Sequence, residues 1–168
     1  ILDNAKSRKE KRSSLSKNTI DADVPLDGKI LIMIFEKPST RTRISFDLAV
    51  KQLGGKSLIL NPDEIHYGSG DESLHDTAKI LSQYADIVML RTPAHKNVEQ
   101  FSKYLDIPII NGLTNLSHPC QIMSDVMTFE ELKGPIKNKK IAYLGDGNNV
   151  VYSLIEASVQ LDFELCIA

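Results

Sequence analysis

The sequence predicts an α/β fold in which helices flank a parallel β-sheet, and two observations carry that prediction. From about residue 29 onward, short apolar runs alternate with amphipathic segments, which is typical of strands joined through helices. The 168 residues are 42% hydrophobic and 25% charged, which is ordinary for a soluble globular protein with a sizeable core. We therefore expect a parallel sheet covered by helices.

Strands are expected where several consecutive residues are apolar, and helices where apolar residues recur every three or four positions. Leu74, Ala78 and Leu81 have this helical spacing, and Ser73 is expected to cap their helix. The expected strands span residues 29–35, 57–60, 87–90, 108–111, 140–144 and 164–168. The expected helices span residues 41–53, 73–84, 98–105, 121–132 and 150–160.

Lys133-Gly134-Pro135 interrupts this alternation, either as a simple turn or as a domain boundary. We expect a first domain over residues 1–133 and the beginning of a second α/β domain over residues 134–168. The latter supplies only a strand, a helix and a strand, which is too little for a core of its own.

The bulk composition excludes several classes of function. A net charge of −2 gives no overall basic field for nucleic acid, and the longest apolar runs are too short to span a membrane. Cys120 and Cys166 fit neither a disulfide framework nor zinc spacing, so we expect a reduced, intracellular setting. The chain begins at Ile1 rather than at methionine, which leaves a missing leader open.

A basic cluster lies within the first twenty residues, at Lys6, Arg8, Lys9, Lys11 and Arg12. We interpret it as the solvated face of a helix, with a nucleic-acid-binding arm as the alternative.

The most informative segment is Phe35–Arg43, with the sequence Phe-Glu-Lys-Pro-Ser-Thr-Arg-Thr-Arg. It leads from a predicted strand, through a turn at Pro38, into a predicted helix. The N–H groups at a helix N-terminus are unpaired and carry partial positive charge. Hydroxyl and guanidinium groups at that position add donors for an anion. The segment therefore predicts a phosphate-binding site.

Three arginines lie at or near this site. Residues two positions apart on a helix point in different directions, so we expect Arg41 to face the phosphate and Arg43 to pair with Asp47. Arg91 directly follows a predicted strand. Ligands of α/β sheets bind beyond the carboxyl ends of strands, so we expect Arg91 to contact the ligand rather than to form a surface ion pair.

The segment His118-Pro119-Cys120-Gln121 follows the fourth predicted strand and admits several interpretations. A Cys–His nucleophile pair is one, and a packed, inert thiol is another. A metal site is disfavoured because no second pair of ligands lies at zinc spacing. We favour His118 and Gln121 as hydrogen-bonding groups at the start of a helix, directed at an uncharged polar part of the substrate.

Two loops add further candidates. Residues 145–149, Gly-Asp-Gly-Asn-Asn, partly match a dinucleotide-binding loop, but Val150 stands where the third glycine belongs. The loop at residues 61–72 contains His66. Loops of that length are often functional, and a plain surface loop is the alternative.

Together, the Phe35–Arg43 segment, Arg91-Thr92, His118–Gln121 and residues 145–149 resemble motifs of the ornithine carbamoyltransferases, from about residue 28 to the end of the chain. The Ser-Thr-Arg-Thr-Arg motif is shared with aspartate carbamoyltransferases and other transcarbamoylases. Cys120 and the Asp-Gly-Asn-Asn loop favour the ornithine enzymes. The family's Ser-Met-Gly and His-Cys-Leu-Pro motifs do not occur in residues 1–168. We therefore expect a carbamoyl-phosphate domain plus the opening of an ornithine domain, with weak carbamoyl-phosphate binding at best and little or no turnover by these residues alone.

The resemblance implies residue roles. Arg91 and His118 would polarise the carbamoyl carbonyl, Gln121 would bind the carbamoyl amide, and Asn149 would bind the backbone end of ornithine. His66 would reach the phosphate of a neighbouring subunit. The phosphate itself would be held by Ser39, Thr40, Arg41 and Thr42.

It also implies transfer of the carbamoyl group from carbamoyl phosphate to the δ-amine of L-ornithine, giving L-citrulline and phosphate without a metal or cofactor. The expected assembly is a homotrimer or a multiple of trimers, in the cytoplasm or, in a eukaryote, the mitochondrial matrix, with no nucleic-acid or membrane partner. The alternatives are an aspartate or putrescine carbamoyltransferase, or a non-catalytic phosphate-binding or assembly module.

Overall fold

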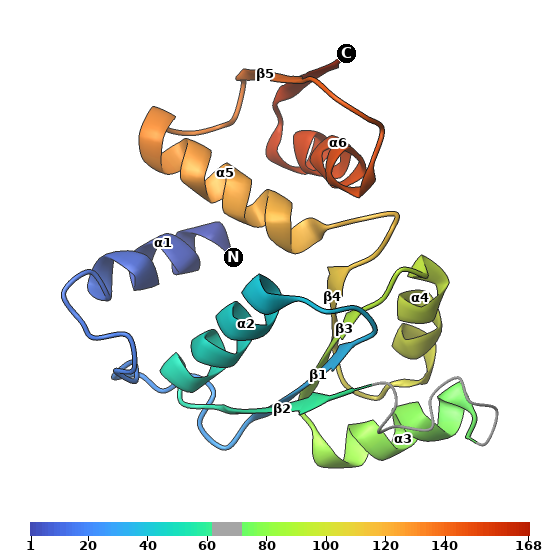
Figure 1. The fold of residues 1–168 in the computed structure, drawn as a ribbon. Helices are drawn as coiled ribbons and strands as arrows, with labels where there is room; N and C mark the ends of the chain where they lie inside the picture. The colour runs from blue at the N-terminus through green and yellow to red at the C-terminus, as the bar shows by residue number, and fades with distance from the viewer. Residues whose placement is uncertain (62–71) are drawn as a thin grey trace. The chain divides into compact units, whose positions relative to one another are not determined.

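A computed structural model describes residues 1–61 and 72–168 of the chain (Figure 1). The chain forms two compact units, one of Leu15–Gly112 and one of Ile1–Ser14 with Leu113–Ala168. In chain order the elements are α1 (Leu2–Lys11), β1 (Ile30–Phe35), α2 (Thr40–Gln52), β2 (Lys56–Leu60), α3 (Leu74–Tyr84), β3 (Ile87–Arg91), α4 (His95–Tyr104), β4 (Ile109–Leu113), α5 (Pro119–Lys133), β5 (Lys140–Tyr143), α6 (Asn149–Leu161) and β6 (Glu164–Ile167).

The predicted fold class is confirmed: a parallel sheet of four strands, in the order β2-β1-β3-β4, is flanked by helices. Alternate residues of β1 point to opposite faces, and both faces are packed. Ile32 and Ile34 lie in a core cluster with α3 and α4 residues such as Ala78 and Phe101. Leu31, Met33 and Phe35 lie in a second cluster on the α2 face, with Phe46 and Val50 among its members. This two-sided burial explains why β1 is a continuous apolar run.

The expected helices and strands are present, with ends that differ by a few residues. Ser73 caps α3 as predicted, since its Oγ accepts a hydrogen bond from the Asp76 N–H at 3.1 Å. The start of α4 lies at His95 rather than at residue 98, because its polar first turn offers no apolar periodicity to read.

The unit of Ile1–Ser14 with Leu113–Ala168 is built around a parallel β5–α6–β6 arrangement. Its core cluster includes Ile122 and Val126 of α5, together with Ile136 and Phe163, and Leu2 of α1 packs against it. Helices α1 and α5 thus supply apolar surface that β5, α6 and β6 lack by themselves. That an ornithine-binding domain begins at residue 134 remains a prediction.

From its composition we expected the basic cluster of α1 to be a solvated helix face, but part of it forms ion pairs within the chain. Lys6 and Lys9 form ion pairs with Glu130 and Glu131 of α5, the second at 2.6 Å. The sequence shows the charges on α1, but it does not show that they pair with acidic residues more than a hundred positions later.

Among the described residues, none of the helices combines the length and the apolar character needed to cross a membrane.

Candidate functional site

The predicted phosphate turn and Arg91 leave the sheet from adjacent strands. Phe35, the last residue of β1, is in register with Arg91, the last residue of β3. The chain continues from β1 to β2 on one side and reaches β3 on the other side of β1. This is the switch point of an open α/β sheet, beyond whose strand ends ligands bind. The two segments that sequence patterns selected separately are therefore neighbours.

The N-terminus of α2 lacks the side-chain cap found on two other helices. Its N-cap residue, Ser39, is extended (φ −155°, ψ 94°) and makes no capping hydrogen bond, and the first turn has no acidic residue. By contrast, Ser73 caps α3, and Asn148 caps α6 by accepting from the Val150 N–H at 2.9 Å. The partial positive charge at the start of α2 is thus available to an anionic ligand.

Arg91 lies against this helix start. Its Nη1 donates to the Thr42 Oγ1 at 3.0 Å, while its buried Nε has no acceptor among the described residues. Desolvation, followed by the like charge of Arg41, lowers the pKa of Arg91. Arginine stays protonated in proteins, so an anion near both guanidinium groups would reduce their mutual repulsion. Thr40 and Arg41 are exposed, and Ser39 and Thr42 are half-buried.

The predicted Arg43–Asp47 ion pair is replaced by a different arrangement. The Asp47 carboxylate accepts from the Lys51 ammonium at 2.8 Å and from the Ser57 hydroxyl. These two hydrogen bonds are the main causes that lower the pKa of Asp47, and Arg43 adds only a weaker charge effect. Lys51 lies at the same four-residue spacing on the other side of Asp47, and Lys51 rather than Arg43 forms the ion pair with this carboxylate.

A network next to Arg91 was not foreseen from the sequence. The Thr92 hydroxyl donates to the Glu36 carboxylate at 2.7 Å, and the Asn97 amide donates to the same carboxylate at 3.3 Å. Thr92 is buried, and the Glu36 N–H donates to the Arg91 carbonyl at 3.0 Å. Glu36 therefore joins the turn after β1 to the turn after β3, using neutral donors rather than the neighbouring arginines.

In the other unit, His118 is the N-cap residue of α5, and its helix begins at Pro119. The His118 backbone N–H donates to the Ser153 hydroxyl of α6 at 2.8 Å. Burial raises the pKa of the Cys120 thiol. Because the thiolate is the reactive form, this environment argues against the Cys–His nucleophile interpretation and favours a packed thiol.

Gln121 and Asn149 each use part of their side-chain amide within the unit. The Gln121 Nε2 donates to the Asp125 carboxylate at 2.9 Å, and the Asn149 Nδ2 donates to the Thr114 carbonyl at 2.7 Å. A carboxylate and a carbonyl only accept hydrogen bonds. These contacts therefore fix the orientation of both amides and direct the Oε1 and Oδ1 acceptors elsewhere.

The structure thus brings Arg41, Thr42 and Arg91 together in one unit. In the other unit, His118 bonds to Ser153 and Asn149 bonds to Thr114, and these contacts join the start of α5 to α6. His66 lies outside the described residues. Within residues 1–61 and 72–168, no group of three or more histidine, cysteine, aspartate or glutamate side chains is placed to hold a metal ion.

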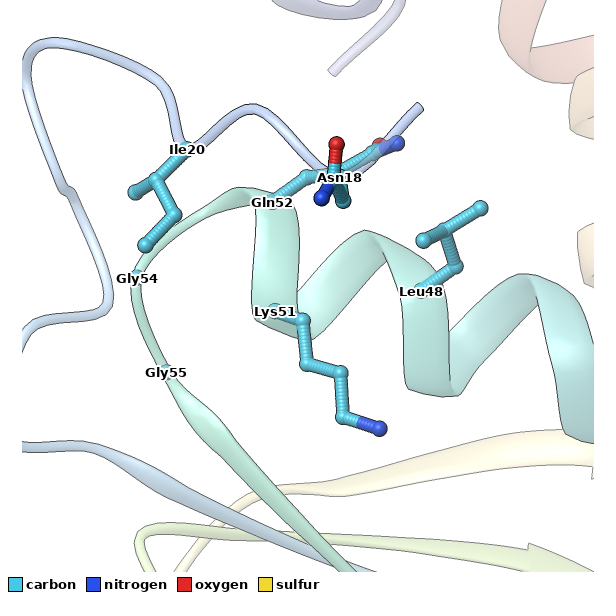
Figure 2. Close-up of a pocket in the computed structure, with 7 residues that line it drawn as sticks. All are labelled: Asn18, Ile20, Leu48, Lys51, Gln52, Gly54 and Gly55. Carbon is cyan, nitrogen blue, oxygen red and sulfur yellow. The ribbon is translucent and has the colours of Figure 1, made fainter. Parts of the chain in front are cut away.

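An open hollow lies at the opposite end of α2 from the phosphate turn (Figure 2). Two of its polar groups are already engaged, Lys51 with Asp47 and the Gln52 amide with the Lys17 carbonyl. It is lined by Asn18, Ile20, Leu48, Lys51, Gln52, Gly54 and Gly55. The predicted site residues that the structure describes lie outside this lining, and we assign no ligand to it.

Comparisons with known proteins identify one family. The family model for the aspartate/ornithine carbamoyltransferase, carbamoyl-P binding domain, matches residues 1–131. The chain is 49% identical over 164 residues to the ornithine carbamoyltransferase of Paracoccus denitrificans, covering 98% of this chain and 53% of that protein. It is 51% identical over 168 residues to that of Caulobacter vibrioides, covering 100% and 54%. The chain therefore spans about half the length of the curated relatives it matches.

Solved structures give the same result. The fold superimposes on the ornithine carbamoyltransferase of Pyrococcus furiosus with a TM-score of 0.91 at 45% identity, covering 99% of this chain and 51% of that one. It also matches the catalytic subunit of the M. jannaschii aspartate transcarbamoylase, with a TM-score of 0.81 at 34% identity, covering 99% and 54%. On the family model, the sequence identities and the shared fold, the chain belongs to the aspartate/ornithine carbamoyltransferase family.

Proposed function

We propose that the chain is the carbamoyl-phosphate-binding part of an ornithine carbamoyltransferase. One observation carries the proposal: Arg91, Thr42 and Arg41 meet at the uncapped N-terminus of α2, at the switch point of the sheet. Two positive side chains, a helix N-terminus and a buried, unsatisfied N–H donor favour a dianionic group over a neutral one.

The phosphate of carbamoyl phosphate binds to the start of α2 in this proposal. Ser39, Thr40 and Thr42 contribute hydroxyl groups and backbone N–H groups, and Arg41 contributes a guanidinium group. Hydrogen bonds to charged groups contribute about 1.5–3 kcal/mol each. Several such bonds favour phosphate strongly, while the exposed position of Arg41 keeps the site open to exchange.

The family resemblance assigns the carbamoyl group to Arg91, His118 and Gln121. Arg91 and His118 polarise the carbonyl and stabilise the oxyanion that forms in the transition state. The carbamoyl NH₂ is a hydrogen-bond donor and needs an acceptor. The exposed Asp125 carboxylate accepts from the Gln121 Nε2, and the Gln121 Oε1 is the atom proposed as that acceptor.

The uncharged δ-amine of L-ornithine attacks the carbamoyl carbon, and Asn149 binds the backbone end of this substrate. A new C–N bond forms, the tetrahedral intermediate collapses, and the C–O bond to phosphate breaks. The phosphate leaves with the bonding electrons and takes up a proton released by the amine, giving L-citrulline. Orienting two bound reactants lowers the activation barrier by up to roughly 7–11 kcal/mol. This route requires no protein nucleophile.

The remaining features of the proposal follow the family resemblance. The carbamoyl-phosphate domain covers residues 1–133, and residues 134–168 begin the ornithine domain. The enzyme is a cytoplasmic homotrimer or a multiple of trimers, or is in the mitochondrial matrix if it is eukaryotic. His66 contacts the phosphate bound to a neighbouring subunit.

A carbamoyl-transfer assay tests the function. The protein at its natural length is supplied with carbamoyl phosphate and, in parallel reactions, with ornithine, aspartate or putrescine. We expect citrulline from ornithine and no comparable product from the other two. Product from aspartate or putrescine instead would overturn the ornithine assignment but not the carbamoyl-phosphate site. No product from any acceptor would favour a non-catalytic module.

A further inference from the structure

The turn that precedes α5 is fastened to α6 by two side chains. Asn149 and Ser153 lie four residues apart and therefore on the same face of α6. The Asn149 Nδ2 donates to the Thr114 carbonyl at 2.7 Å, and the Ser153 hydroxyl accepts from the His118 backbone N–H at 2.8 Å. One helical face thus holds both ends of the segment 114–118.

This fastening is buried and specific. Ser153 is 3% exposed and Thr114 is fully buried, so water does not replace their hydrogen bonds. The Thr114 hydroxyl also accepts from the Ser117 N–H at 3.0 Å and thereby closes the turn. A serine inside a helix usually bonds to the carbonyl of its own preceding turn, but this one accepts from a backbone N–H 35 residues earlier.

We propose that Ser153 is a positioning residue for His118. By accepting the His118 N–H, Ser153 sets the backbone from which the imidazole reaches the carbamoyl carbonyl. Because Ser153 shares its helix face with Asn149, the residue proposed for ornithine is mechanically tied to the residue proposed for the carbonyl. This inference rests on the proposed function, since it gives His118 a ligand.

The test separates carbonyl binding from phosphate binding. Carbamoyl phosphate and inorganic phosphate are titrated calorimetrically into the protein at its natural length and into its Ser153→Ala, His118→Ala and double variants. Net hydrogen-bond energies of about 0.5–1.5 kcal/mol correspond to roughly a two- to tenfold loss of carbamoyl-phosphate affinity in Ser153→Ala. Inorganic phosphate has no carbonyl, so its affinity should not change.

Two further variants exclude a general structural effect. Ser153→Thr keeps a hydroxyl and should recover carbamoyl-phosphate affinity. Ser158→Ala is the matched control on the same helix, because its hydroxyl donates to a carbonyl of that helix, that of Ile155 at 2.7 Å. In the double variant the loss should equal that of His118→Ala, because residues that act through one another are not additive. If Ser153→Ala does not fold, Ser153→Cys offers a weak sulfur acceptor for the same test.

Unchanged carbamoyl-phosphate affinity in Ser153→Ala, beside a loss in His118→Ala, would overturn the role of Ser153 and leave the proposed function intact. Equal losses for carbamoyl phosphate and inorganic phosphate would reduce Ser153 to a structural residue. If the unmodified chain and His118→Ala bind carbamoyl phosphate equally, the carbonyl role of His118 fails and this inference fails with it.

Discussion

At the scale of single residues, the site depends on how Arg91 is presented. A free arginine side chain has many rotamers, and fixing one costs up to about 2 kcal/mol of conformational entropy. The Thr42 hydroxyl holds Nη1 at 3.0 Å, while Nε is buried without an acceptor among the described residues. The guanidinium is therefore positioned before a ligand arrives, and binding does not bear the full cost of ordering it.

Replacing Thr42 by valine should weaken carbamoyl-phosphate binding about two- to tenfold, because the near-isosteric side chain removes one hydroxyl hydrogen bond. Thr42→Ser should recover most of the affinity. Thr128→Val on α5 is the control, since that hydroxyl donates to the Ser124 carbonyl of its own helix. Calorimetry on the three variants decides the matter, and unchanged affinity in Thr42→Val would remove Thr42 from the site.

Glu130 predicts a pH dependence of stability. Its carboxylate accepts from the Ile136 N–H at 3.0 Å and from Lys6, and these contacts lower the pKa of Glu130. A carboxylate with a depressed folded pKa stabilises the fold above its unfolded pKa, about 4.3, and loses that contribution as the pH falls through the folded pKa.

We therefore expect the free energy of unfolding, from urea titrations, to fall as the pH drops below about 4.3, and to fall less steeply in Glu130→Gln. Glu156→Gln, an exposed position on α6, serves as the control. Parallel pH profiles for the original chain and Glu130→Gln would contradict this account.

At the level of helices and strands, the N-termini of the helices differ in whether a side chain caps them. Three helices show the range: α3 is capped by Ser73, α6 is capped by Asn148, and α2 has no side-chain cap at Ser39. A cap stabilises a helix, whereas an uncapped N-terminus keeps its N–H groups for a ligand. Helices α1, α4 and α5 also lack a side-chain cap, so the uncapped start of α2 indicates a ligand site only together with Arg41 and Arg91 beside it.

Ser73→Ala should lower the free energy of unfolding by about 1 kcal/mol, since it removes the acceptor for the Asp76 N–H. Ser73→Thr keeps both the acceptor at the cap and the hydroxyl that donates to the Asp76 carboxylate at 2.7 Å, and it should remain close to the original stability. Urea denaturation of both variants gives the comparison. If the alanine and threonine variants are equally stable, the cap contributes nothing.

The elements were largely predictable because their signals are local. The apolar run of β1 and the spacing of Leu74, Ala78 and Leu81 reflect burial of neighbouring residues in the sequence. The shared edge of the phosphate turn and Arg91 followed from a rule about parallel sheets. The Thr92–Glu36 and Ser153–His118 hydrogen bonds join residues 56 and 35 positions apart, and no local pattern in a single sequence specifies which distant partner a hydroxyl meets.

At the scale of the whole molecule, the two ends of the chain share one core. Leu2 packs against the cluster of Ile122, Val126, Ile136 and Phe163, and α1 adds the ion pairs to Glu130 and Glu131. Sequence reasoning found that residues 134–168 are too few for a core. It missed α1 as a supplier of the remaining surface because Leu2 is one apolar residue in a polar helix.

Deleting residues 1–14 should therefore lower amide hydrogen-exchange protection in residues 113–168 and leave the sheet residues of Leu15–Gly112 largely protected. The reason is that α1 belongs to the same unit as residues 113–168, and hydrogen exchange reports local stability. Exchange measured by mass spectrometry on the original and shortened chains resolves the two regions. Loss of protection that is equal in both would show that α1 stabilises the chain as a whole.

We propose that the start of α2 binds the phosphate of carbamoyl phosphate, and a calorimetric titration of Arg41→Ala measures the part that this side chain plays. Arg41 is exposed, so its removal should leave the fold intact, and Arg43→Ala, two positions further along, is the matched control. Our expectation is that the original chain binds carbamoyl phosphate and that Arg43→Ala binds it nearly as well. Arg41→Ala should lose at least about tenfold in affinity, the effect of one charge-assisted hydrogen bond. Equal affinity in Arg41→Ala and the original chain would contradict it.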